Sequence, residues 1–142
     1  MNKKVQDIID KHLSSDKIIE SVSMTTDFRT HNKEMKKLNK LVLNISHDTS
    51  LCEKVYVQLL KSENPTTLLN ASSECLKLNI FVEQAKKNLK LLAKRNDIGI
   101  ISFNARMMLN EWEKEIKNGE KNWRVCWKTY CIRFNYWICK ND

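Results

Sequence analysis

The chain has 142 residues, with 25 basic and 17 acidic side chains and a net charge of +8. Its length is typical of one fold around one core, and no segment approaches the roughly 20 apolar residues that a membrane-spanning helix requires. Two glycines and one proline leave little material for hairpins, and no run up to residue 116 alternates as a strand would. These features predict an all-α protein.

The first predicted helix lies near the amino terminus, and its apolar stripe contains a histidine. The stripe at helical spacing consists of Val5, Ile8, Ile9, His12 and Leu13. His12 is therefore expected to be a core or boundary residue rather than a metal ligand. Ser15 and Asp16 allow two interpretations, because they can restart a helix or lie within one long helix.

Two more helices are predicted between residues 30 and 60. After a connection over residues 24–29, one helix is defined by Met35, Leu38, Val42 and Ile45. Ser50 and Glu53 have the spacing of a capping box, in which side chain and backbone satisfy each other's free groups at a helix start. The apolar positions that follow at helical spacing are Cys52, Val55, Tyr56, Leu59 and Leu60.

Residues 64–116 are predicted to form three short amphipathic helices with almost no room between them. Asn64 can cap the first of these, and Pro65 suits a first turn, where its missing N–H costs nothing. The three stripes are Leu68, Ala71, Cys75 and Leu78; Val82, Ala85, Leu89 and Leu92; and Ile101, Ala105, Met108, Leu109, Trp112 and Ile116. Short helices of this kind bury their stripes against neighbours, as in helical-repeat proteins.

Residues from about 16 to 116 resemble the small bacterial HEAT-like family catalogued as domain of unknown function 2019. The resemblance rests on segments in the same order: His31-Asn32-Lys33, Asn64-Pro65, Ala71 through Leu78, Gln84 through Leu89, and Ser102 through Leu109. It implies a right-handed α-α superhelix of about six helices over residues 1–119. It brings no catalytic residue set, and it implies an interaction protein. By analogy, small helical repeats also occur as immunity proteins beside bacterial toxins.

The carboxy-terminal segment, residues 120–142, departs from the family pattern because it gathers aromatic and basic side chains. Its aromatic residues are Trp123, Trp127, Tyr130, Phe134, Tyr136 and Trp137. A helical period gives one continuous stripe and a period of two gives a strand face, and the helix is preferred. The segment is expected to pack on the last repeat, although its composition also suits single-stranded nucleic acid, an anionic membrane interface or a homodimer seam.

Lysines are patterned on two of the predicted helices. Lys33, Lys37 and Lys40 share one face, and Lys87, Lys90 and Lys94 share another. Stacked repeats could join the two rows into one basic surface, which would attract an acidic protein or a nucleic acid. With Trp123 and Trp127, these six lysines are the candidate partner-binding residues, and a solvated helix exterior is the alternative.

Catalytic patterns are not recognisable in the sequence. Gly99 and Gly119 are isolated, so no phosphate-binding loop is predicted, and Cys126, Cys131 and Cys139 lack the compact spacing of a metal site. No cofactor is expected. The absence of a signal-like apolar run and the two cysteines on apolar stripes favour the cytoplasm. The sequence thus predicts a non-enzymatic protein-binding scaffold, with an immunity protein against a toxin as the leading hypothesis and a nucleic-acid-binding protein as the alternative.

Overall fold

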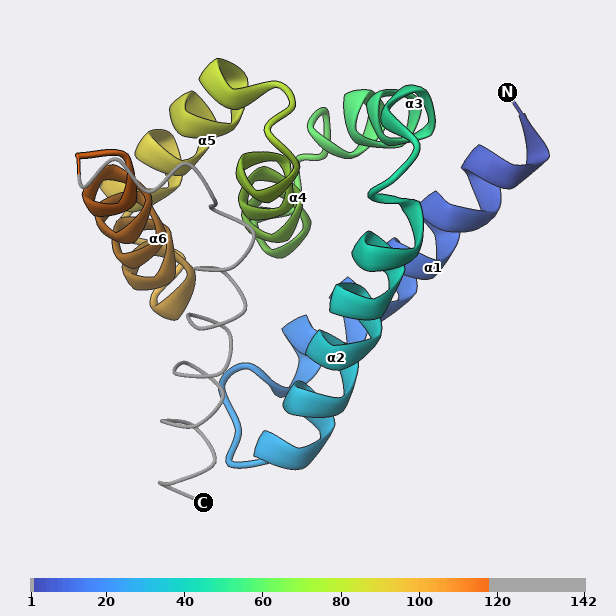
Figure 1. The fold of residues 1–142 in the computed structure, drawn as a ribbon. Helices are drawn as coiled ribbons and strands as arrows, with labels where there is room; N and C mark the ends of the chain where they lie inside the picture. The colour runs from blue at the N-terminus through green and yellow to red at the C-terminus, as the bar shows by residue number, and fades with distance from the viewer. Residues whose placement is uncertain (1, 118–142) are drawn as a thin grey trace. The chain divides into compact units, whose positions relative to one another are not determined.

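The computed structural model describes residues 2–117, and in this range it contains six α-helices and no strand. The helices are Lys3–Val22 (α1), Phe28–Ile45 (α2), Thr49–Leu59 (α3), Pro65–Leu78 (α4), Val82–Lys94 (α5) and Ile100–Lys117 (α6). The predicted all-α fold is therefore confirmed (Figure 1). The prediction that the carboxy-terminal segment is helical lies outside the described residues.

The helices form two compact units that divide between Ala71 and Ser72, inside α4. In the amino-terminal unit, α1 packs along α2, and α3 packs against both (Figure 1). The core of this unit contains Val5, Ile8, Ile9, Ile19, Leu38, Val42, Ile45, Val55, Tyr56 and Leu59. The prediction of one domain over residues 1–119 with an attached segment over residues 120–142 stays a prediction.

One long helix, α1, accommodates both Ser15 and Asp16, which decides between the two interpretations of that region. Asn2 caps α1 by accepting a hydrogen bond from the backbone N–H of Lys4. His12 is buried as predicted, whereas Leu13 is exposed and does not belong to the buried stripe. A helix turns 100° per residue, and this rotation places Leu13 just beyond the edge of the arc that contains the buried residues of α1.

Aspartates begin both α2 and α3. Hydrogen bonds from the side chain and the backbone N–H of Thr30 lower the pKa of the Asp27 carboxyl. With this cap, α2 starts at Phe28 rather than near His31. Asp48 accepts a hydrogen bond from the N–H of Leu51 at 3.0 Å, and α3 starts at the next residue. The predicted capping box at Ser50 is wrong, because Ser50 lies inside α3 and the Asp48 side chain already accepts from the free backbone donor.

The start of α4 agrees with the sequence prediction. Asn64 Oδ1 accepts a hydrogen bond from the N–H of Thr66 at 2.9 Å, and Pro65 is the first helical residue. At the other end, Asn79 adopts a left-handed conformation (φ 57°), and the N–H of Ile80 donates to the carbonyl of Cys75. This is a Schellman motif, which ends the helix by satisfying a free carbonyl.

In the carboxy-terminal unit, α5 packs against α6. Their shared core includes Ala85, Leu89, Leu92, Ala105 and Leu109, as the sequence predicts. Ser102 Oγ lies 2.7 Å from the carbonyl oxygen of Arg95, to which it donates, and so ties the start of α6 to the end of α5. No helix in residues 2–117 is long and apolar enough to cross a membrane.

Candidate partner-binding surface

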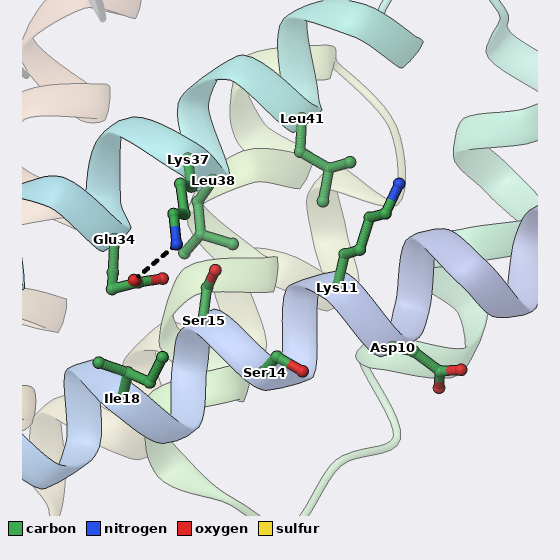
Figure 2. Close-up of a pocket in the computed structure, with 9 residues that line it drawn as sticks. All are labelled: Asp10, Lys11, Ser14, Ser15, Ile18, Glu34, Lys37, Leu38 and Leu41. Carbon is green, nitrogen blue, oxygen red and sulfur yellow. Dashed lines mark hydrogen bonds and ion pairs between the residues drawn. The ribbon is translucent and has the colours of Figure 1, made fainter.

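The three lysines predicted to share a face of α2 do not have the same surroundings. Lys33 and Lys40 are exposed and form no ion pair with any residue that the structure describes. Lys37 Nζ instead donates to Glu34 Oε1 at 3.0 Å, on the side of α2 that faces α1 (Figure 2). The charge of Lys37 is therefore already compensated inside the protein.

Glu34, the hydrogen-bond partner of Lys37, is buried, and only 4% of Glu34 is exposed. Burial acts to raise its pKa, but hydrogen bonds from Lys37 and Ser15 and the positive charges of Lys37 and Lys33 outweigh this effect. The pKa of Glu34 consequently lies below its ordinary value. Glu34 is thus an ionised partner for Lys37 at neutral pH.

A longer row of cations runs along the outer side of α2. Arg29, Lys33, Lys36 and Lys40 are all exposed, and their spacing of four, three and four residues places them on one line along the helix. At 1.5 Å per residue this line is about 17 Å long. We call these four residues the α2 cationic row. Leu43, which is 63% exposed, lies three residues beyond Lys40 and continues the same line.

Two members of this row, Arg29 and Lys36, are absent from the sequence prediction. Arg29 is missed because α2 was expected to begin after it, whereas Asp27 caps the helix earlier. Lys36 is missed because positions 33, 37 and 40 fit helical spacing as well as positions 33, 36 and 40. Only the hydrogen bond from Lys37 to Glu34 separates the two choices.

On α5, Lys87, Lys90 and Lys94 are exposed as predicted, and they surround an exposed leucine. Leu91, 56% exposed, lies within one helical turn of all three lysines. Lys86, the residue before Lys87, differs from these three lysines because its Nζ lies 4.9 Å from the centroid of the half-buried Trp112 ring. Trp123 and Trp127 lie outside the described residues, and the union of the α2 and α5 rows into one basic surface stays a prediction.

A groove of about 410 Å³ lies between α1 and α2, and most of its charged groups are already paired. Lys37 is paired with Glu34, Lys11 Nζ lies 3.1 Å from Asp7, and Asp10 accepts from Gln6 at 2.8 Å. The exposed Asp10 carboxylate, hydrogen-bonded only to the neutral Gln6 amide, is the one charge of this lining without a charged partner, so the groove offers little to select a ligand. Figure 2 shows its lining, which comprises Asp10, Lys11, Ser14, Ser15, Ile18, Glu34, Lys37, Leu38 and Leu41.

A polar cluster is enclosed in the amino-terminal unit. Asp16 accepts from Asn70 Nδ2 at 2.8 Å and lies 2.7 Å from His12 Nδ1. The ring of Tyr56 meets the His12 ring edge-on, with centroids 6.5 Å apart. His12 and Asp16 are each only 1% exposed, so a ligand cannot reach them, and the cluster joins α1 to α3 and α4. Within residues 2–117, no group of three or more His, Cys, Asp or Glu side chains is arranged to hold a metal ion.

Comparison with known proteins identifies no protein that is significantly similar to this chain. No protein-family model matches the sequence, and neither a curated protein nor a solved structure is significantly similar to it.

Proposed function

We propose that this chain is a non-enzymatic helical scaffold that binds another protein, as HEAT-like interaction proteins do. The observation that carries this proposal is that both units present a leucine, more than half exposed, beside exposed lysines. These leucines are Leu43 at the end of the α2 cationic row and Leu91 among the lysines of α5. Each helix thereby offers an apolar contact and a surrounding of positive charge.

An apolar side chain beside charges is typical of a protein interface. Protein interfaces have an apolar centre with a polar rim, and a few buried side chains contribute most of the binding free energy. A leucine has no planar face on which a nucleic-acid base could stack, and a phosphate backbone offers it no apolar surface. Lysines alone would suit either partner, so the leucines favour protein.

The particular role we propose is that of a bacterial immunity protein, which neutralises a cognate toxin by covering its active surface. This role requires a rigid surface and no catalytic group of its own. The support is the analogy with other small helical-repeat immunity proteins. We place this activity in the cytoplasm, in keeping with the buried thiols of Cys52 and Cys75, which are typical of a reducing compartment.

Affinity capture from the lysate of the native host, with and without nuclease, tests whether the partner is a protein. The tagged full-length chain should recover one protein in stoichiometric amount from both lysates. Recovery that disappears after nuclease treatment would contradict the proposal and identify nucleic acid as the partner. Inhibition of a purified partner's toxic activity by the chain would test the immunity role.

Leucine variants then test which surface makes the contact. We expect Leu43→Ser or Leu91→Ser to weaken binding of the recovered protein by about tenfold or more, since an interface anchor contributes about 1–2 kcal/mol. Met24→Ser is the matched control, because Met24 is also exposed and apolar but lies between α1 and α2. Equal loss in all three variants would argue against a specific surface.

A further inference from the structure

The α2 cationic row carries more positive charge than the stability of α2 favours. Neighbouring members of the row are three or four residues apart, and like charges at this spacing repel one another on a helix surface. Arg29 also lies in the first turn of α2, where the helix dipole disfavours a cation, and this turn contains no acidic residue. Both features disfavour the isolated helix.

No carboxylate of the described residues forms an ion pair with a member of this row, and only Lys33 is attracted at longer range, to Glu34. Glu34, the one acidic residue of α2, is buried and hydrogen-bonds to Lys37, which flanks the row on the side of α2 that faces α1. Arg29, Lys33, Lys36 and Lys40 form no ion pair with any residue between 2 and 117. Four aligned, exposed cations without a direct ion pair are therefore available to an external group of anions.

We propose that the α2 cationic row binds an acidic α-helix of the partner protein. This inference rests on the proposed function and specifies the partner's surface. A helix with carboxylates at i, i+4, i+7 and i+11 presents them on one line with the same rise as the row, so that each can meet one cation. Flanking charges of this kind determine partner choice between paired helices.

Leu43 indicates which kind of side chain follows the acidic stripe on the partner helix. It extends the row by three residues and is 63% exposed, so the partner helix meets it with an apolar side chain next to its acidic stripe. Charge complementarity selects the acidic helix, and the leucine favours a partner with an apolar side chain over a phosphate backbone, which offers it no apolar contact. The occupant is thus an amphipathic helix with one acidic and one apolar section.

Titration of the ¹⁵N-labelled full-length chain with two synthetic helical peptides tests the inference by NMR. One peptide of about 20 residues carries four glutamates and a leucine at the spacing of the row, and its isomer has the same composition with the glutamates distributed around the helix. We expect the aligned peptide to shift the amide signals of α2 and to bind several-fold more tightly than the isomer. Equal affinity for the two peptides would overturn the inference.

Two charge-matched variants separate a specific row from overall charge. Lys33→Glu/Lys36→Glu should weaken binding of the aligned peptide about tenfold or more, whereas Lys87→Glu/Lys90→Glu on α5 should weaken it less than about threefold. Circular dichroism checks that both variants remain folded. Equal losses would show that only net charge matters and would overturn the inference. Tighter binding of an oligothymidylate probe through the same α2 residues would overturn it in favour of nucleic acid.

Failure of this inference and failure of the proposed function give different results. One outcome is that the lysate partner is a protein that binds the Lys33→Glu/Lys36→Glu variant as tightly as it binds the unmodified chain. In that case the scaffold function stands, the inference about the α2 cationic row fails, and the partner binds another surface. If no protein is recovered after nuclease treatment, the proposed function itself fails.

Discussion

His12 and Asp16 face each other across one turn of α1, with Nδ1 of the histidine 2.7 Å from Oδ2 of the aspartate and each residue only 1% exposed. The other carboxylate oxygen of Asp16 accepts from Asn70 of α4. We expect Asp16→Ala to lower the free energy of unfolding by about 2–5 kcal/mol, because two buried donors lose their acceptor. Urea denaturation followed by circular dichroism measures this change.

The control for this prediction is Asp10→Ala on the same helix. Asp10 is exposed and accepts a hydrogen bond from Gln6, so its loss should change the unfolding free energy by less than about 0.5 kcal/mol. A similar small effect for Asp16→Ala would show that the cluster does not stabilise the fold.

The start of α3 provides a second test, since the sequence suggests Ser50 as the cap and the structure shows Asp48. Asp48→Ala should destabilise the protein by about 1 kcal/mol through loss of the hydrogen bond from the N–H of Leu51. Ser50→Ala should have almost no effect, because Ser50 is exposed inside the first turn. Thermal unfolding of the two variants compares them directly, and a larger loss for Ser50→Ala would contradict the observed cap.

Helical periodicity predicts the core well where burial is one-sided. On α5 it correctly selects Ala85, Leu89 and Leu92, because this helix has one buried face and one charged face. It fails on α4, where Thr67, Ser72 and other polar residues are also buried. Burial of polar side chains depends on partners from other parts of the fold, which hydropathy along the chain does not register.

Helical spacing in the sequence predicts part of the candidate partner-binding surface. Exposed lysines on α2 and α5 follow from helical spacing, but spacing leaves open whether Lys36 or Lys37 belongs with Lys33 and Lys40. The answer depends on the contact of Lys37 with Glu34, a buried carboxylate on the side of α2 that faces α1. A single-residue shift on a helix is decided by tertiary contacts rather than by local pattern.

Leu89 and Leu91 form a natural pair for testing the core of the carboxy-terminal unit. Leu89 is fully buried, so Leu89→Ala should lower the free energy of unfolding by about 2–5 kcal/mol through lost apolar burial and the cavity left behind. Leu91→Ala on the exposed side of α5 should change it by less than about 0.5 kcal/mol. Chemical denaturation distinguishes these values, and equal effects would contradict the burial of Leu89 and the exposure of Leu91 on opposite sides of α5.

Repulsion within the α2 cationic row predicts that one charge reversal stabilises the fold. Lys36→Glu replaces repulsion from Lys33 and Lys40 by attraction, and we expect a gain of about 0.5–1 kcal/mol at low salt. Lys36→Gln should give about half of this gain, because it only removes the repulsion. Urea denaturation at low and high salt measures both, and a loss of stability for Lys36→Glu would show that the row is not self-repelling.

His31 makes stability depend on pH near neutrality. It is partly buried, and burial lowers its pKa from the ordinary value of 6.5, while a hydrogen bond with Asn32 acts in the opposite direction. The unfolded chain therefore binds the proton more readily than the folded chain. Above pH 6.5 the histidine is neutral in both states, and His31 does not lower the free energy of unfolding. As the pH falls below that value, the unfolded chain takes up the proton first, and the free energy of unfolding should decrease.

Unfolding free energies measured between pH 5 and pH 8 check this dependence. His31→Gln should make the decrease below pH 6.5 clearly smaller, because the side chain that must be kept neutral is gone. His47→Gln is the control, since His47 is exposed near the end of α2, and this variant should retain the decrease. The assignment to His31 fails if both variants show the pH dependence of the unmodified chain.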